Sequence, residues 1–253
     1  MKIWRNQILR KLTSLRIGGP ADYFCQPNNS QELQEALFFA QKNKLPTMVL
    51  GAGTNILFSD AGRRGLVLKM GPGFNRISAK GNLVTVGAAV LLPNLVVKMA
   101  QRDLGGLEFL AGIPGSVGGA VMMNAGAWGK DISKFIEQIN AVNSEGKKRT
   151  FKKGRIKFSY RQSLWPKGTW IITDVLLRFK KQNKTIIKSQ IISYLSRRRL
   201  SQPLGVPNCG SVFKNPPGQF AGQLIENAGC KGLRCGDAQV STRHANFIIN
   251  LGE

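Results

Sequence analysis

The stretch from Gly112 to Gly129, GIPGSVGGAVMMNAGAWG, constrains the fold more than any other part of the chain. Six of its 18 residues are glycine, three are alanine and none is charged. Glycine tolerates positive φ and close backbone approach but loses much conformational entropy on folding, so such a concentration needs a reason. Two interpretations fit. One is tight packing of buried backbone. The other is a cradle whose peptide N–H groups bind the phosphates or ring carbonyls of a cofactor.

Length and hydropathy place the chain among globular proteins. Its 253 residues can form one large domain or two modest ones. No apolar run approaches the roughly 18–20 residues that a membrane helix requires. The basic N-terminus, MKIWRNQILRKLTS, lacks the apolar core and cleavage site of a secretory signal. We expect a plain N-terminal lead there, with a weakly amphipathic arm as the alternative, and a cytoplasmic protein without a membrane partner.

The charge balance is strongly basic, with 37 Lys and Arg against 13 Asp and Glu and a formal net charge of +24. Such an excess raises the question of nucleic-acid binding. The basic residues are scattered in twos and threes, however, and no zinc finger or aromatic-plus-basic RNA signature is present. An anionic ligand or a compositional bias fits the charge equally well, and we expect no nucleic-acid partner. The sequence assigns no oligomeric state.

Cysteine and histidine usage argues against a metal site and a disulfide framework. No C-x-x-C pair occurs, and His244 is the only histidine. We expect no bound metal and buried or incidental thiols at Cys25, Cys209, Cys230 and Cys235.

Periodicity and capping signals predict a chain of mixed helices and strands with a domain boundary near Lys181. Ser30 is expected to cap the first helix. The expected helices span about 31–42, 92–103, 190–200 and 221–229. The expected strands span about 21–26, 46–50, 65–69, 75–78, 83–86, 136–143, 148–152, 170–180 and 246–251, with a hairpin turn at 144–146.

A second glycine-rich element, Gly51 to Asn55 (GAGTN), directly follows the strand expected at 46–50. It contains no lysine, so it is not a Walker loop, and it lacks the third glycine of the dinucleotide fingerprint. Taken alone, it is typical of a β-turn.

Six motifs occur in a characteristic order along the chain. They are LGAGTNILFSD (50–60), AGIPGSVGGAVMMNAGAWG (111–129), YRQS (160–163), NCGSVFKNP (208–216), AGQLIENAGCKG (221–232) and VSTRHANFIIN (240–250). In this order and spacing they closely resemble the UDP-N-acetylenolpyruvoylglucosamine reductases (UDP-N-acetylmuramate dehydrogenases), flavoenzymes of bacterial peptidoglycan precursor synthesis. The resemblance covers roughly residues 12–252.

The resemblance implies an α+β protein of two domains. The first, at 12–181, is an FAD-binding domain of the vanillyl-alcohol-oxidase/p-cresol-methylhydroxylase type, and the second, at 182–253, is a small α+β substrate-binding domain. In this family NADPH reduces FAD, and the flavin N5 delivers hydride to the enolpyruvyl β-carbon of UDP-N-acetylglucosamine enolpyruvate. A protein acid then protonates the α-carbon, which gives UDP-N-acetylmuramate.

The resemblance also implies that FAD is held by the two glycine-rich elements. Backbone N–H groups in 51–55 and 115–119 suit a pyrophosphate because they need no charged side chain. The residues assigned to the cofactor are Gly51, Ala52, Gly53, Thr54, Asn55, Gly112, Ile113, Pro114, Gly115, Ser116, Gly118, Gly119, Asn124 and Gly126.

Two catalytic residues are implied by their motifs. Arg161 of YRQS matches the family arginine that binds the substrate carboxylate and polarises the enolpyruvate. Ser211 of GSVFKNP matches the serine that protonates the α-carbon, a role that requires a polarising neighbour and exclusion of water. Without the family, Arg161 is typical of a surface arginine in a strand, and Ser211 of a turn hydroxyl.

Three further positions are assigned to substrate binding. Lys214 and Asn215 suit diphosphate or carboxyl oxygens, whereas Lys214 would otherwise be a solvated lysine. Tyr160 suits either substrate contact or the core, and both interpretations stay open.

One feature departs from the family pattern. The family's third catalytic residue, a glutamate, lies some tens of residues beyond the HANFIIN strand, whereas this sequence ends at Glu253. We expect a truncated, frameshifted or decaying copy, or one whose end is encoded elsewhere, with apolar surface or a sheet edge exposed in the second domain. We therefore expect FAD binding with slow or absent turnover.

Two alternatives belong to other classes. One is another FAD oxidoreductase of the same fold, such as an alcohol oxidase. YRQS, GSVFKNP and the lack of a flavin-linking histidine near the GIPG segment argue against it. The other is a noncatalytic basic protein that binds nucleic acid, for which only the net charge speaks.

Overall fold

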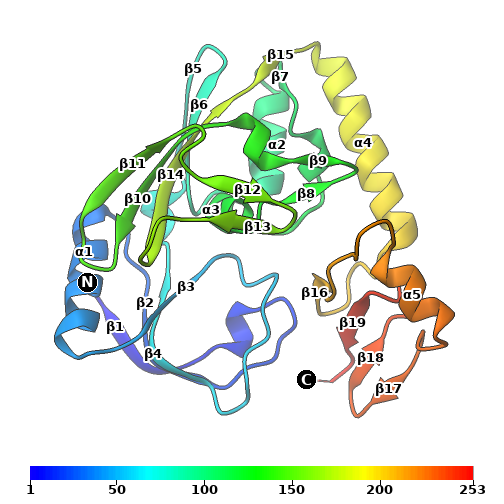
Figure 1. Ribbon diagram of the computed structural model, residues 1–253, viewed down its shortest axis with the longest axis horizontal. Coiled ribbons are helices and arrows are strands. Elements are labelled where there is room, and N and C mark those ends of the chain that lie inside the picture. The colour runs from blue at the N-terminus through cyan, green and yellow to red at the C-terminus, as the bar shows by residue number, and fades with distance from the viewer. Residues whose placement is uncertain (253) are drawn as a thin grey trace. The chain divides into compact units, whose positions relative to one another are not determined.

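The computed structural model describes residues 1–252, whose helices and strands are shown in Figure 1. They form two compact units. Unit 1 comprises Met1–Gln7, Ala21–Ala52 and Arg64–Tyr194, and unit 2 comprises Ile8–Pro20, Gly53–Arg63 and Leu195–Glu253. The units are interleaved in sequence, so the compact units do not follow a single cut near residue 181. The functional division into domains at 12–181 and 182–253 stays a prediction.

The first sheet of unit 1 has four strands in the order β1-β2-β4-β3. Its strands are β1 (Ile3–Ile8), β2 (Pro20–Cys25), β3 (Thr47–Leu50) and β4 (Arg63–Lys69), and β3 and β4 run parallel. Helix α1 (Ser30–Lys42) buries a stripe at helical spacing that includes Leu33 and Leu37, and this stripe packs with Leu66 and Leu68 of β4. Cys25 lies in the same cluster, and burial raises the pKa of its thiol to about 12.

Asn29 caps helix α1, which corrects the expectation of a cap at Ser30. Its side chain accepts a hydrogen bond from the Glu32 N–H at 2.9 Å. The Glu32 carboxylate in turn accepts from the Asn28 N–H at 2.8 Å. The two bonds use N–H groups that the helix itself leaves unpaired. Asn29 and Ser30 are both good capping residues, so the sequence alone did not separate them.

The second sheet of unit 1 is antiparallel and has the order β11-β10-β14-β6-β5. Its strands are β5 (Ile77–Lys80), β6 (Leu83–Gly87), β10 (Ile136–Asn143), β11 (Lys148–Lys152) and β14 (Trp170–Arg178). The central strand β14 carries four fully buried aliphatic residues, and Ile139 of β10 pairs with Val175 of β14 on one side and Phe151 of β11 on the other.

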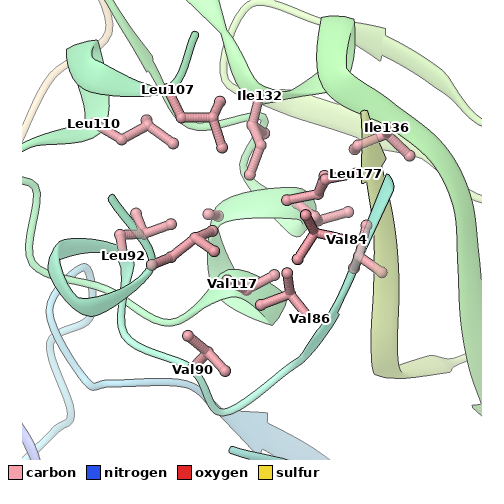
Figure 2. Packing of buried hydrophobic residues seen from close by; sticks show 14 of the residues in the cluster. Val84, Val86, Val90, Leu92, Leu107, Leu110, Val117, Ile132, Ile136 and Leu177 are labelled. Carbon is pink, nitrogen blue, oxygen red and sulfur yellow. The ribbon is translucent and has the colours of Figure 1, made fainter. Parts of the chain in front are cut away.

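Helices α2 (Leu92–Ala100) and α3 (Val117–Met122) join this sheet in the main hydrophobic core. Figure 2 shows Val86 of β6, Leu177 of β14, Leu92 of α2 and Val117 of α3 gathered in one cluster. Burial of such side chains contributes roughly 1.5–3 kcal/mol each. Helix α3 contains the middle of the glycine-rich stretch, so packing of α3 into this core fixes the middle of that stretch.

Helix α4 (Lys184–Ser201) is divided between the units, because unit 1 ends at Tyr194 and unit 2 resumes at Leu195. Ile187, Ile191 and Tyr194 lie on its more buried side. Short elements complete unit 1. The paired short strands are β7 (Leu104–Gly105) with β15 (Lys180–Lys181), β8 (Gly126–Ala127) with β9 (Lys130–Asp131), and β12 (Lys157–Ser159) with β13 (Gln162–Leu164). Unit 1 also contains 3₁₀ turns at Pro72–Phe74, Glu108–Leu110 and Ile132–Phe135.

Unit 2 contains a four-stranded sheet in the order β16-β19-β18-β17, together with helix α5 (Ala221–Asn227) and a 3₁₀ turn at Arg10–Leu12. Its strands are β16 (Asn208–Ser211), β17 (Arg234–Cys235), β18 (Ala238–Val240) and β19 (Phe247–Asn250). Phe220, Leu233 and Phe213 are 73%, 63% and 58% exposed. The expected exposure of apolar surface is therefore present in this unit.

Most expected elements occur within a few residues of their expected bounds, and three differ. The N-terminal lead is strand β1, because it pairs with β2. Helix α4 begins at Lys184 rather than about Gln190, since the packing of Ile187 extends it through a polar, lysine-rich segment. Helix α2 ends at Ala100, and Asp103 beyond it has a φ of 57°. Within residues 1–252, every helix is too short or too polar to cross a lipid bilayer.

We predict that Leu95→Ala lowers the free energy of unfolding by about 2–5 kcal/mol, because it leaves a cavity in the core. Leu95 is 0% exposed on α2, whereas Val97 on the same helix is 51% exposed and serves as the control. Urea unfolding followed by tryptophan fluorescence measures both variants. Val97→Ala is expected to stay within about 0.5 kcal/mol of wild type. Equal losses in the two variants would contradict the assignment of the core.

Candidate active site

The two glycine-rich elements meet at Gly51. A methyl group added to Gly51 would lie 2.9 Å from the Ser116 Oγ and 3.9 Å from the Gly119 Cα. Gly51 directly follows strand β3, and Ser116 is the N-cap of helix α3. Close backbone approach is a condition that glycine satisfies and other residues do not. The fold therefore brings together two segments that lie 65 residues apart in the sequence.

The segment 51–55 presents backbone N–H groups that the protein does not use. Within residues 1–252, the N–H groups of Ala52, Gly53 and Asn55 donate no hydrogen bond. The Gly53 carbonyl, by contrast, accepts from the Ser14 N–H at 2.9 Å. Gly53 has a φ of 71°, and a methyl group there would meet the Leu12 carbonyl oxygen at 1.9 Å. Uncommitted N–H groups on a tightly held segment suit a phosphate or a similar anion.

Only part of the segment 115–119 is available in the same way. The Val117 and Gly118 N–H groups donate to the carbonyls of Val90 and Ala88 at 2.8 and 3.0 Å. Among the described residues, the N–H groups of Gly115 and Ser116 have no such partner. The N–H groups of Val117, Gly118 and Gly119 thus bond within the protein, the last to the Ser116 Oγ at 3.4 Å, and the role of this segment in holding the cofactor stays a prediction. At Gly118 the tight contact with Ala88, 3.1 Å from an added methyl, explains the glycine.

The remaining residues assigned to the cofactor lie around α3. Gly112 and Gly115 have φ values of 73° and 158°, which a glycine adopts readily. Ile113 is half-buried, and Pro114 is exposed. Gly126 lies in β8, and a methyl group there would meet the Lys130 carbonyl oxygen at 2.3 Å, so packing accounts for this glycine. Of the two interpretations of the glycine-rich stretch, tight packing therefore explains Gly126, and cofactor binding by the other residues assigned to it stays a prediction.

Arg161 lies in the two-residue loop of the β12–β13 hairpin, not within a strand. Its φ is 54°, in the left-handed region. Its Nη2 donates to the Gly126 carbonyl at 2.7 Å, and the guanidinium lies 5.1 Å from the centroid of the Tyr160 ring. Tyr160 is 52% exposed, so it is not a core residue. A guanidinium supported on an aromatic ring and a carbonyl is well arranged to bind a carboxylate.

The same hairpin is tied to the glycine-rich stretch at other points. Ser163 Oγ donates to the Met122 carbonyl at 2.6 Å and accepts from the Trp165 Nε1–H at 2.9 Å. Figure 1 shows the hairpin beside α3. Asn124, which the sequence assigned to the cofactor, instead has a buried side chain that bonds within the protein, to Ser159 and Ser133.

Ser211 ends strand β16 in unit 2. It is exposed, pairs with Phe247 of β19 and has no side-chain hydrogen bond among residues 1–252. Gly210 before it has a φ of 80°, and the register of β16 against β19 shifts between Asn208 and Ser211. The bulge turns the end of the strand. The polarising neighbour expected beside the hydroxyl is absent from the described hydrogen bonds.

Asn246, which sequence reasoning missed, holds the segment that follows Ser211. Its side-chain amide donates to the Phe213 carbonyl and accepts from the Phe213 N–H, both at 2.9 Å, and it is 3% exposed. Next to it, His244 Nδ1 accepts from the Asn246 N–H at 3.2 Å. Burial lowers the pKa of His244, so the ring is neutral at pH 7. The HANF motif contains Asn246, but the contact of its side chain with the Phe213 backbone depends on pairing across the sheet, which the motif does not show.

Lys214 and Asn215 follow on the same exposed segment. The Asn215 Oδ1 accepts from the Ala221 N–H at 3.0 Å and so fixes the start of helix α5. Within unit 1 the fold thus brings together Gly51, Ala52, the 112–126 segment, Tyr160 and Arg161. Unit 2 holds Gly53, Thr54, Asn55, Ser211, Lys214 and Asn215.

Two family models match the chain. The FAD binding domain matches residues 21–152, and the C-terminal domain of UDP-N-acetylenolpyruvoylglucosamine reductase matches residues 202–253. The uncommitted N–H groups of Ala52 and Gly53 and the close approach at Gly51 fit a dinucleotide cofactor. FAD is therefore the cofactor of this fold.

Curated relatives and solved structures agree with these matches. The chain is 44% identical to UDP-N-acetylenolpyruvoylglucosamine reductase 2 of Symbiobacterium thermophilum, over 100% of the chain and 82% of the relative. It is 42% identical to the reductase of Desulforamulus reducens, over 98% of the chain and 82% of the relative. The crystal structure of the reductase from Thermus caldophilus superposes with a TM-score of 0.90 at 38% identity, over 100% of the chain and 90% of that structure.

A more distant structure shows how far the fold extends. The crystal structure of 6-hydroxy-D-nicotine oxidase from Arthrobacter nicotinovorans has a TM-score of 0.53 at 14% identity, covering 71% of this chain and 42% of that one. At this identity the likeness concerns the fold alone.

We predict that Gly51→Ala weakens FAD binding about 5- to 150-fold, equivalent to the 1–3 kcal/mol of an overpacked contact. The added methyl displaces the Ser116 hydroxyl, 2.9 Å away, and with it the start of α3. Titration of the apoprotein with FAD, followed by flavin fluorescence, measures the effect.

The matched variant is Gly51→Ala with Ser116→Ala. Among residues 1–252, apart from the chain neighbours of Gly51, the Ser116 Oγ is the only atom within 3.4 Å of the added methyl, so its removal is expected to restore most of the affinity. Ser116→Ala alone controls for loss of the cap. Unchanged FAD affinity in Gly51→Ala would contradict the proposed contact between the two glycine-rich elements.

The geometry and the comparisons lead to one conclusion. The hairpin that carries Arg161 is hydrogen-bonded to the glycine-rich segment of an FAD-binding fold. Residues 202–253, later in the chain, match the C-terminal domain of UDP-N-acetylenolpyruvoylglucosamine reductase. Identity extends along the whole chain to proteins of that family. The chain belongs to the UDP-N-acetylenolpyruvoylglucosamine reductase family.

Proposed function

We propose that this chain catalyses the NADPH-dependent reduction of UDP-N-acetylglucosamine enolpyruvate to UDP-N-acetylmuramate, a step of peptidoglycan precursor synthesis. The observation that carries the proposal is the attachment of the Arg161 hairpin to the glycine-rich segment of an FAD-binding fold. The identity of 44% to a named reductase supports it and speaks against another FAD oxidoreductase of the same fold. We also propose a cytoplasmic location.

The cofactor is held by backbone groups in this proposal. Ala52, Gly53 and Asn55 would donate their N–H groups to the pyrophosphate, with Gly115 and Ser116 as further donors. When bound, FAD supplies the transfer of hydride from NADPH to the enolpyruvyl double bond.

Arg161 has two roles in the proposed reaction. Its guanidinium binds the carboxylate of the enolpyruvyl group, and it stabilises the negative charge that develops at the adjacent α-carbon. The carbonyl of Gly126 and the ring of Tyr160 hold the group in place before substrate arrives.

Ser211 supplies the proton in this proposal. Its hydroxyl donates the proton to the α-carbon, and the serine oxygen then regains a proton from water. Ser211 is exposed and its hydroxyl has no hydrogen-bond partner among residues 1–252, so bound substrate must exclude water from it. Lys214, on the same exposed segment, would bind the diphosphate of the substrate.

The FAD-loaded protein tests the proposal through the oxidation of NADPH at 340 nm. Oxidation is expected to depend on the enolpyruvyl sugar, and the product is expected to be heavier than the substrate by two hydrogens. Oxidation that ignores the sugar would contradict the proposal. The sequence-based prediction of slow turnover stays a prediction, and the same assay measures it.

We predict that Ser211→Ala lowers kcat by about 10²- to 10⁴-fold, the usual contribution of a general acid. The reduction of bound flavin by NADPH in the absence of sugar is expected to stay unchanged, because it needs no protonation of carbon. Rapid mixing with absorbance detection separates the two half-reactions. Ser201→Ala is the matched control, since Ser201 Oγ donates to the Arg197 carbonyl on the exposed last turn of α4. Equal turnover in Ser211→Ala and Ser201→Ala would contradict the role of Ser211.

A further inference from the structure

Asn124 combines a buried side chain with a left-handed backbone. It lies just after helix α3, is 5% exposed and has a φ of 42°. A non-glycine residue in the left-handed region is uncommon, and asparagine tolerates it better than most. A buried side-chain amide must find hydrogen-bond partners or destabilise the fold.

Both ends of the Asn124 amide have partners in other elements. Its Nδ2 donates to the Ser159 carbonyl at 3.0 Å, and its Oδ1 accepts from the Ser133 N–H at 3.3 Å. One partner only accepts and the other only donates, so the orientation of the amide is fixed. The Ser133 N–H has a second acceptor, the Asp131 carboxylate at 3.1 Å. Among the described hydrogen bonds, the Ser159 carbonyl has no other donor from a side chain.

Ser159 is the last residue of β12 before the loop that contains Arg161. The bond from Asn124 therefore holds the hairpin one residue before the loop. Arg161 Nη2 bonds to Gly126, and Ser163 Oγ bonds to Met122, at 2.7 and 2.6 Å. All three bonds end on the five-residue segment 122–126, at the end of the glycine-rich stretch.

We infer that Asn124 is a positioning residue that sets where the Arg161 guanidinium lies relative to the cofactor segment. The inference rests on the proposed function, since it acts through the substrate-binding role of Arg161. Two of the three bonds belong to the hairpin's own side chains, whereas the bond from Asn124 runs from the glycine-rich segment to the hairpin backbone. A displacement of about 1 Å in such a group lowers turnover about 10²-fold.

Two variants test the inference. Asn124→Gly accepts the left-handed φ but removes the amide, and Asn124→Asp keeps the size and the acceptor but replaces the donor that faces the Ser159 carbonyl. The matched control is Asn143→Ala. Asn143 is a structural asparagine of the β10–β11 turn whose Oδ1 accepts from the N–H groups of Glu145 and Lys147.

The first readout is hydrogen exchange in the FAD-loaded protein. Backbone amides of residues 157–164 are expected to exchange at least tenfold faster in both Asn124 variants than in wild type or Asn143→Ala. Unchanged exchange at 157–164 would overturn the inference. This readout needs no turnover, so it decides the inference even if the wild-type chain shows no sugar-dependent oxidation of NADPH and the proposed function fails.

The second readout is kinetic. The Asn124 variants are expected to lower kcat/KM for the enolpyruvyl sugar about 10- to 100-fold, while FAD content and the rate of flavin reduction by NADPH stay within twofold of wild type. In an Arg161→Ala background, Asn124→Gly is expected to add less than a twofold loss, because the group that it positions is already gone. An equal loss in both backgrounds, or an equal slowing of both half-reactions, would overturn the inference. If Asn124→Gly does not fold, Asn124→Asp carries both measurements.

Discussion

The close approach of Gly51 to the start of helix α3 is the constraint on which the site depends. Strand β3 delivers Gly51 to a position where a methyl group would lie 2.9 Å from the Ser116 hydroxyl. A side chain at position 51 would crowd this hydroxyl, so glycine lets the end of β3 lie against the cap of α3. The main core holds α3 from the other side through Val117 and Val121, both fully buried. As a result, the uncommitted N–H groups near Gly51 are placed by packed elements, not by a mobile loop.

The same glycine-rich stretch connects the cofactor to the substrate chemistry. Its first part caps α3 and meets Gly51. Its last part accepts hydrogen bonds from Arg161 and Ser163 of the hairpin and donates one, from Asn124, to Ser159. In the proposed function, the same stretch therefore positions both the cofactor and the substrate-binding arginine. This arrangement explains why the stretch carries no charge: its groups are backbone amides and carbonyls, whose directions are fixed by the fold.

The sequence predicted the long periodic elements and the family well, because apolar periodicity and motif order are local properties. It also predicted that the two glycine-rich elements hold FAD together; the contact at Gly51 shows that they are neighbours, and their joint role stays a prediction. It did not predict β1, since a strand with half-exposed residues acquires its meaning only by pairing with β2. The roles of Gly118, Asn124 and Asn246 also escaped it, because each depends on a partner distant in sequence: Ala88, Ser159 and Phe213.

Hydrogen exchange with and without FAD tests the central claim most directly. The account predicts that FAD slows exchange of the backbone amides at 52–55 and 115–116. Among the described residues, the N–H groups at 52, 53, 55, 115 and 116 donate no hydrogen bond, whereas Thr54 has another interaction. The amides of Val117 and Gly118, already bonded to Val90 and Ala88, are expected to change little. Binding of FAD without protection at either glycine-rich element would contradict the account.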